Sequence, residues 1–266
     1  MISNFKTRLF LVLFAAGFAG VLSFLLLDLA AMAALFPSPS GTQLQITPAI
    51  KALSLVQPTV LLALAVFAGV LLAAKVGLSA PVAEAVAASG ARRGLLASLG
   101  PQVGPGVLGS VVGAGSVLLS AAVFKPFITA ESIARISAFT KLLPLPTRFL
   151  YGGITEEVLM RWGLMTLLVW GAWRLFQKER SKPGAMCFVL AILVSAFVFG
   201  LGHLPVALML LGEPTAAVVL FVIVANSAFG IVAGYLYWKF GLESAMIAHV
   251  LGHVILVTAS YAGAYF

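Results

Sequence analysis

Charged residues are scarce in this chain. They make up 9% of its 266 residues, whereas 62% are hydrophobic and the mean hydropathy is +1.12. Soluble domains carry charge on about a quarter of their residues, so this chain has too little polar surface to remain dissolved in water. Its apolar runs are long and continuous. Backbone groups in hydrocarbon must be satisfied within the chain, and we therefore predict membrane-spanning helices rather than a barrel.

Cysteine is nearly absent, and the one present, Cys187, lies in an apolar run. A lone cysteine cannot form an intramolecular disulfide, and we interpret it as a buried structural thiol.

The net charge of +8 comes from lysines and arginines in short segments beside the apolar runs, without a long basic stripe interleaved with aromatics. This pattern is typical of membrane-protein loops and does not indicate nucleic-acid binding.

Residues 1–266 are predicted to form a single integral membrane domain, an all-α polytopic bundle of about seven, or eight, spans. The runs that could cross a bilayer are 9–35, 54–74, 103–124, 147–173, 184–212, 215–238 and 242–264. Residues 128–143 are expected to form a helix on the membrane surface, and residues 177–184 an aqueous loop. Basic residues are more numerous on the side of the N-terminus, which predicts a multi-pass cell-membrane protein with a cytoplasmic N-terminus.

Two pairs of glycines are spaced for close helix packing. Gly109 and Gly113 lie four residues apart in the third run, as Gly230 and Gly234 do in the sixth. Small residues at this spacing let helix backbones approach each other, so both helices are expected inside the bundle.

Ionisable residues inside the apolar runs cost roughly 2.5 to 3.5 kcal/mol each on insertion scales, so each needs a physical reason. They occur in the fourth, fifth and seventh runs and include every histidine of the chain: Glu156, Glu157, Arg161, His203, His249 and His253. Counting along each helix brings Glu156 and the histidines to a similar depth near the bilayer centre. One shared polar site explains this coincidence.

The spacing within each helix assigns different roles to these residues. Glu157 and Arg161 are four apart and can form an ion pair, whereas Glu156 points about 100° away and can face a cavity. His249 and His253 share one helix face and can converge on a ligand, an ion or an oxyanion. A free carboxylate with imidazoles can activate water, which favours hydrolysis of an amide bond.

Three motifs carry a resemblance to a known family. Glu156-Glu157-x-x-x-Arg161, Phe199-x-x-x-His203 and His249-x-x-x-His253 follow one another within residues 150–255. In order and spacing they resemble the motifs of the CPBP family, the type II CAAX prenyl endopeptidases and their bacterial Abi-type relatives.

The resemblance implies a glutamate-dependent intramembrane endopeptidase with a conical polar active-site cavity. It implies that Glu156 and His203 activate water and that His249 and His253 stabilise the oxyanion, supported by Glu157, Arg161 and Phe199. The implied partners are the lipid bilayer and a peptide or lipidated protein substrate, such as a prenylated CAAX-type tail or a small membrane peptide.

His253 departs from the family pattern, which often has asparagine at this position. A histidine can ligate metal or titrate, whereas an asparagine can only form hydrogen bonds. Family members are labelled metalloproteases, but the spacing here is not HExxH. Zinc therefore stays open as a cofactor, with Glu156, His203, His249 and His253 as its candidate ligands.

Other functions remain compatible with the same residues. Glutamate and histidine at mid-depth also form proton relays in transporters, although no duplicated halves are visible. His203 with His249 or His253 could ligate haem. A catalytically idle relative of the bacteriocin-immunity type would share the fold but not the activity.

Asn226, in the sixth run, is interpreted as a residue that bridges helices.

Overall fold

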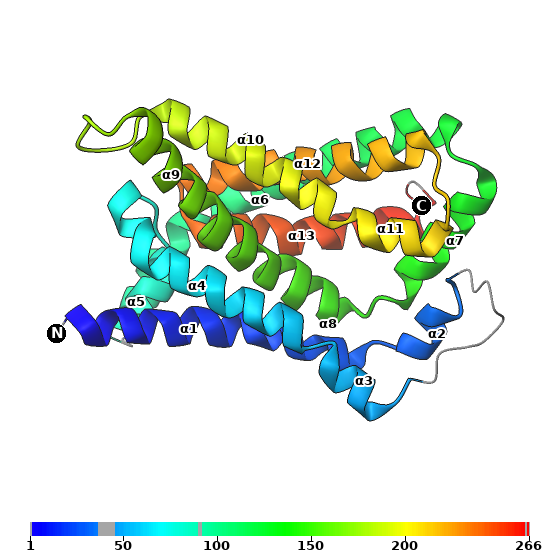
Figure 1. Ribbon diagram of the computed structural model, residues 1–266, viewed down its shortest axis with the longest axis horizontal. Coiled ribbons are helices and arrows are strands. Elements are labelled where there is room, and N and C mark those ends of the chain that lie inside the picture. Colours follow the sequence, from blue (N-terminus) through cyan, green and yellow to red (C-terminus); the bar gives the residue numbers. More distant parts are fainter. Residues whose placement is uncertain (1, 37–45, 90–91, 264, 266) are drawn as a thin grey trace.

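The protein is described from a computed structural model that covers residues 2–36, 46–89, 92–263 and 265. These residues form helices joined by turns and short loops, and no β-strand occurs among them. The predicted all-α polytopic bundle is thus confirmed (Figure 1). In order along the chain, the helices are α1 (Ile2–Leu22), η1 (Ser23–Leu26), α2 (Leu29–Ala33), α3 (Pro48–Leu53), α4 (Val56–Val76), α5 (Pro81–Ser89), α6 (Arg92–Phe124), η2 (Lys125–Phe127), α7 (Ala130–Leu142), α8 (Leu145–Thr147), η3 (Arg148–Thr155), η4 (Val158–Met165), α9 (Thr166–Phe176), α10 (Ala185–Gly202), α11 (Leu204–Leu211), α12 (Ala216–Lys239) and α13 (Leu242–Tyr261).

The long helices run along one axis of the molecule, with most of the short helices at one end and α5 near the N-terminus. Figure 1 shows α2, α3, α7 and α11 at the end opposite the N-terminus, together with the end of α13. Large apolar side chains remain exposed on the outside of the bundle, among them Leu11, Leu64, Leu108 and Leu193. In water such a surface would aggregate, so the bundle is built for contact with lipid.

Six helical segments of the described residues are long and apolar enough to cross a membrane. They are Asn4–Leu26, Pro48–Val76, Gly94–Phe127, Ala185–Leu211, Ala216–Lys239 and Leu242–Tyr261. The predicted span 147–173 is helical from α8 through α9, but its charged residues keep it out of this apolar class. Seven or eight crossings therefore stay a prediction.

The first predicted span, 9–35, has the wrong boundaries. Here α1 begins at Ile2, and the chain turns at Leu27, whose backbone is extended with ψ 133°. Asp28 then starts a new helix, because its carboxylate accepts a hydrogen bond from the amide of Ala31 at 3.0 Å. A capping residue inside the apolar run thus ends the span earlier than hydropathy alone suggests.

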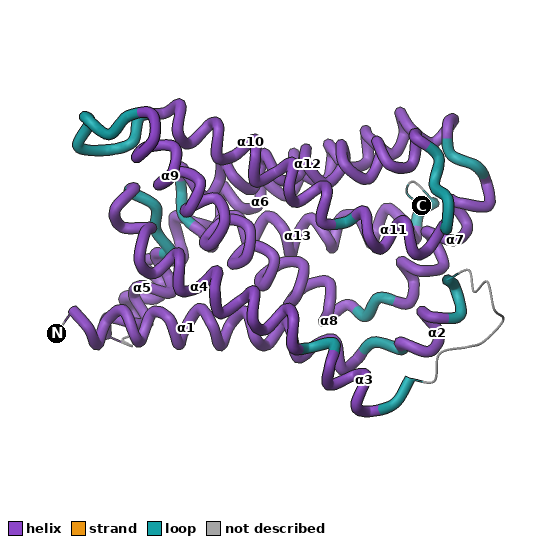
Figure 2. Tube along the Cα trace, in the orientation of Figure 1, coloured by secondary structure: helices purple, strands orange, loops and turns teal. Residues whose placement is uncertain are grey.

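The fifth predicted span, 184–212, agrees with one membrane-spanning segment, Ala185–Leu211, which has an internal interruption. The break between α10 and α11 falls at His203 and is visible as a short loop in Figure 2. Pro205 lies in the first turn of α11, where its missing N–H removes a helical hydrogen bond and its ring is accommodated only at a helix start. The third span also differs, because α6 already begins at Arg92 rather than near 103.

The glycine pairs pack inside the bundle as predicted. A Cβ on Gly109 would lie 2.4 Å from a methyl carbon of Leu236, and one on Gly113 would lie 2.7 Å from the ring of Phe229. Gly230 and Gly234 approach α10 in the same way. Two of the closest contacts in the bundle, α6 with α12 and α12 with α10, therefore depend on residues without side chains.

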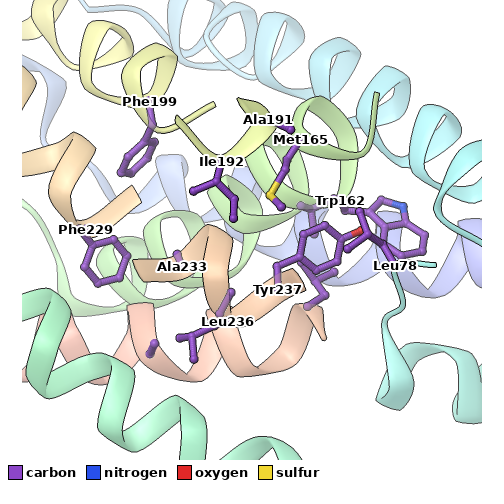
Figure 3. Close-up of a cluster of buried hydrophobic side chains, with 14 of the residues drawn as sticks. Leu78, Trp162, Met165, Ala191, Ile192, Phe199, Phe229, Ala233, Leu236 and Tyr237 are labelled. Atoms are coloured by element: carbon purple, nitrogen blue, oxygen red, sulfur yellow. The ribbon is translucent and has the colours of Figure 1, made fainter. Parts of the chain in front are cut away.

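The hydrophobic core lies between these helices. Trp162, Met165 and Tyr237 are among its largest fully buried side chains, and Figure 3 shows Trp162 and Met165 of η4 together with Tyr237 of α12. The indole nitrogen of Trp162 donates a hydrogen bond to the carbonyl of Val66 at 3.3 Å. Cys187 is buried in the same core, as the sequence indicates.

Candidate active site

The two adjacent glutamates lie between two unusual helical segments. Both η3 and η4 are π-helical, with wider turns than an α-helix, and Glu156 and Glu157 stand between them. Wide turns of this kind are rare and occur often at functional sites. The two carboxylates point in different directions. Glu157 points into the protein, and Glu156 points into a cavity.

Glu157 is fully buried and contacts two partners. One of its oxygens lies 3.2 Å from Nε of Arg161, which confirms the predicted pair. Its other oxygen accepts a hydrogen bond from Nδ1 of His249 at 2.7 Å, and the Arg161 guanidinium donates to the carbonyl of Gly230 at 3.0 Å. Arg161, Glu157 and His249 thus form one connected series that joins η4, α12 and α13.

This series fixes the proton positions on His249. A carboxylate accepts only, so Nδ1 of His249 carries a hydrogen, and the ring presents Nε2 on its other side. That Nε2 lies 3.9 Å from a carboxylate oxygen of Glu156. Glu156 and His249 therefore face each other across a short gap on the cavity wall.

Glu156 keeps some access to solvent, since its side chain is 20% exposed while that of Glu157 is fully buried. The predicted division between an outward and an inward carboxylate is therefore confirmed. What the spacing did not reveal is that the buried carboxylate also orients a histidine from another helix.

His203 stands at the break between α10 and α11. Its Nδ1 lies 2.8 Å from the carbonyl oxygen of Phe199, one turn earlier, so Nδ1 donates and Nε2 can accept a hydrogen bond in the neutral ring. Phe199 packs against the rings of His203 and His249, at centroid distances of 4.7 and 6.0 Å, and under the guanidinium of Arg161 at 5.0 Å. The aromatic ring therefore spaces these three side chains.

His253 stacks on His249, with the ring centroids 4.9 Å apart, as their shared helix face predicts. Its Nε2 is buried and has no hydrogen-bond partner among the described residues. Gly152, in η3, leaves the space that this ring occupies, because a Cβ there would lie 2.5 Å from Nε2 of His253. A buried imidazole nitrogen without a partner can serve a bound substrate.

A cavity of about 880 Å³ joins these groups. Glu156, His203, His249 and His253 all line it, so the side chains that the sequence placed at one depth do meet in one site. The remaining lining is mainly apolar and comes from η1, α6, α7, α11, α12 and the end of α13. Glu156 and the three histidines therefore form one polar wall, and the other, mainly apolar lining also includes Lys141 and Arg148.

Asn226 belongs to this cavity, which differs from its interpretation as a helix bridge. Its amide nitrogen donates to the carbonyl of Val222 in its own helix at 2.8 Å, and the residue lines the same cavity as Glu156. A single asparagine in an apolar run gives no direction for its side chain, so the sequence could not distinguish the two roles.

The donor atoms of the site are arranged for hydrogen bonds rather than for a shared metal ion. Nδ1 of His203 and Nδ1 of His249 already contact protein oxygens, and Nε2 of His249 is 3.9 Å from Glu156. Within the described part of the chain, no three His, Cys, Asp or Glu side chains form a group that could hold an ion. A zinc site needs at least three protein ligands at about 2.0–2.3 Å. The residues as placed do not fit zinc, and no step below depends on it.

Comparison with known families supports the motif assignment. Residues 138–255 match the family model described as "Type II CAAX prenyl endopeptidase Rce1-like". The match covers less than half of the chain and supports the resemblance to the CAAX-type membrane proteases. It runs from α7 to α13 and includes Glu156, His203, His249 and His253 of the cavity wall. No curated protein and no solved structure matches the chain.

Proposed function

We propose that the protein is a membrane-embedded endopeptidase that hydrolyses a peptide bond in the cavity between η3, α10 and α13. The observation that carries this proposal is the 3.9 Å approach of Glu156 to Nε2 of His249, on a cavity wall that also holds His203 and His253. A carboxylate and imidazoles around one space are the groups that water activation and oxyanion stabilisation require.

In the proposed reaction, a water molecule lies between the Glu156 carboxylate and Nε2 of His203. Glu156 takes one proton as the water oxygen attacks the carbonyl carbon of the scissile bond, and the carbonyl π electrons move to its oxygen. N–H groups of His253 and of protonated His249 stabilise this oxyanion. The tetrahedral intermediate then collapses, the C–N bond breaks, and Glu156 returns its proton to the leaving nitrogen.

Glu157 and Arg161 act through His249 rather than on the substrate. The hydrogen bond from Nδ1 of His249 to Glu157 holds the ring with its Nε2 3.9 Å from the Glu156 carboxylate. Arg161 in turn compensates Glu157. The series therefore orients His249 beside Glu156, while the charge of the buried Glu157 is balanced by Arg161.

The orientation in the membrane follows from the basic residues at the two ends of the bundle. The end that holds the N-terminus carries Lys6, Arg8, Lys75, Arg92, Arg93, Arg174, Lys178, Arg180, Lys182 and Lys239. The opposite end carries Lys51, Lys125, Arg135, Lys141 and Arg148. We infer that the larger set marks the cytoplasmic side and that the N-terminus is cytoplasmic. Because residues near the end of α13 line the cavity, we infer that it opens on the other side.

This orientation bears on the substrate. A cavity that opens away from the cytoplasm receives peptides or lipidated proteins from the non-cytoplasmic side, whereas a cytoplasmic prenylated tail would not reach it. Fusions of alkaline phosphatase and of green fluorescent protein after α13 distinguish the two. Active phosphatase with dark fluorescent protein is the expected pair, and the reverse pair contradicts the orientation.

The activity is tested with purified protein in detergent and fluorogenic peptides, with and without a lipid anchor. Glu156→Gln keeps the shape of the side chain and removes the base, so cleavage should fall by about 10²–10⁴-fold. Glu213→Gln, an exposed carboxylate in the loop before α12, is the matched control and should cleave as the wild type does. Cleavage that survives unchanged in Glu156→Gln would show that another group is the base.

A further inference from the structure

The side chain of Asn226 is a polar group of the cavity that the proposed reaction does not use. It lies on α12, and the other residues that this helix contributes to the lining are apolar: Phe221, Val222, Ala225 and Phe229. Within the described part of α12, Asn226 is thus the one polar side chain on the cavity wall. An amide in an apolar helix is costly unless its hydrogen bonds are satisfied, so this residue needs a physical reason.

The Asn226 side chain makes a single hydrogen bond to the residues that the structure describes. Its amide nitrogen donates to the carbonyl oxygen of Val222 at 2.8 Å, one turn earlier in the same helix. Because a carbonyl oxygen can only accept, the amide must present its nitrogen there, and this fixes which side of the amide is oxygen. An asparagine has two N–H donors and an oxygen that accepts. Oδ1 and one N–H are therefore left without a partner among these residues.

The free amide oxygen can be reached from the cavity. Asn226 is half-buried, and its Oδ1 keeps accessible surface, whereas Nε2 of His253, which also lacks a partner among the described residues, is enclosed. A hydrocarbon chain in the cavity would leave this oxygen without a hydrogen bond, which costs free energy. An occupant that carries an N–H group is therefore expected beside Asn226, and the backbone of a peptide is such an occupant.

Asn226 lies one helical turn from the catalytic wall. Phe229, three residues later on α12, packs on the ring of His249 with 4.5 Å between the ring centroids. Three residues of an α-helix rise about 4.5 Å, whereas an extended peptide advances about 3.3 Å per residue. Asn226 is therefore level with a peptide group one or two residues from a bond placed between His249 and Glu156.

We propose that Oδ1 of Asn226 accepts a hydrogen bond from a backbone N–H of the substrate peptide, one or two residues from the scissile bond. This inference rests on the proposed endopeptidase function and adds a substrate-binding residue to it. The contact recognises the main chain rather than a side chain, so it holds an extended peptide in register with Glu156 without requiring a particular sequence. Asn226 does not touch the reacting atoms, and its effect is expected mainly in KM.

Backbone-modified peptides test this contact. The fluorogenic peptide of the activity assay is compared with its ester analogues, in each of which one backbone N–H near the scissile bond is replaced by oxygen. An ester removes the donor without adding bulk, and mass spectrometry of the products verifies that the same peptide bond is cut. For the wild type, we expect one ester within two residues of the scissile bond to lower kcat/KM by about three- to tenfold, the effect of one hydrogen bond.

The variant Asn226→Leu assigns this loss to the asparagine. Leucine has a similar volume but no hydrogen-bonding group, so the variant should cleave the unmodified peptide about three- to tenfold less efficiently, mainly through KM. It should lose nothing further on the sensitive ester, because the hydrogen bond is already absent. Asn226→Ala removes the same group with a smaller side chain, and the same pattern is expected if leucine packing is not the cause. Asn4→Leu makes the matched substitution on the exposed first turn of α1 and should behave as the wild type.

Other results overturn the contact. A loss in Asn226→Leu that is equal for the peptide and for every ester shows a structural role, and unchanged kcat/KM in Asn226→Leu shows no role in binding. If the wild type cleaves none of the peptides, the proposed function fails, and the contact is measured separately by fluorescence anisotropy with Glu156→Gln protein. Weaker binding of one ester than of the peptide, a difference that disappears when Asn226→Leu is added, supports the contact. Equal binding of all peptides, or no binding, rejects it.

Discussion

Glu157 and His249 are joined by a 2.7 Å hydrogen bond although 92 residues separate them in the sequence. The bond fixes which nitrogen of His249 faces Glu156, and it does so from a position that no substrate can reach, because Glu157 is fully buried. Groups that orient a reacting imidazole in this way commonly affect activity and stability together.

Glu157→Gln should reduce both stability and activity. The amide leaves the buried Arg161 without a compensating charge, and loss of one partner of a buried pair costs about 3–5 kcal/mol of unfolding free energy. Activity should fall by about 10–100-fold, as for other residues that orient a ligand or base. Thermal unfolding in detergent and kcat are the measurements.

The chain offers a matched control for this pair at the same spacing. Glu131 and Arg135 also lie four residues apart, at 3.0 Å, but their side chains are exposed on α7. Glu131→Gln should change neither property appreciably, since exposed pairs contribute little. Equal losses in the two variants would mean that burial of Glu157 is not the reason.

Gly152→Ala should impair catalysis while the bundle stays folded. The added methyl group would lie 2.5 Å from Nε2 of His253, so the imidazole must leave its position on the cavity wall. We expect kcat to fall by about tenfold or more, as when an oxyanion donor is displaced. Gly115→Ala in α6 has open space at its Cβ and should retain full activity.

A double variant tests whether displacement of His253 causes the loss of activity in Gly152→Ala. Combining Gly152→Ala with His253→Asn replaces the ring by a shorter side chain, so part of the lost activity should return. If the double variant is no better than Gly152→Ala alone, the methyl group acts on something other than His253.

His253→Asn should keep much of the wild-type kcat, whereas His253→Ala should lose about 10²-fold. An asparagine amide can still donate to an oxyanion, and alanine cannot. The same pair of variants addresses zinc, because asparagine is a poor zinc ligand. Metal content and kcat, measured together for each variant, test whether His253 ligates a metal. A strong loss of both in His253→Asn would assign His253 to a metal site.

Gly69→Ala should destabilise the protein without a specific effect on catalysis. Its Cβ would lie 2.1 Å from the indole nitrogen of Trp162, a ring buried in the core, so the two helices must separate. We expect a loss of about 1–3 kcal/mol, typical of overpacking. Gly171→Ala in α9 meets no neighbouring atom and serves as the control in the same unfolding assay.

The sequence predicted the parts of the site that depend on helical spacing. The pairing of Glu157 with Arg161, the common face of His249 and His253, and their meeting with Glu156 and His203 all follow from counting residues along helices. The roles of these residues in a reaction stay predictions.

Contacts that depend on how helices are placed beside each other were not predictable in this way. The bond from Glu157 to His249, the fit of His253 against Gly152 and the reach of the cavity to α7 need the tertiary structure. Some helix boundaries were predicted wrongly for a local reason. Asp28 and Pro205 interrupt runs that remain apolar on average, and a hydropathy window does not detect one capping or breaking residue.

The burial of Cys187 has a practical consequence for mapping the cavity. A polar maleimide cannot reach a thiol enclosed by the core, so the wild-type chain should stay unlabelled while it is folded. Any single cysteine introduced at the cavity wall, for example at Ser260, then reports its own accessibility without removal of the native one. The labelling rate of such a thiol in intact cells measures from which side of the membrane the cavity is open.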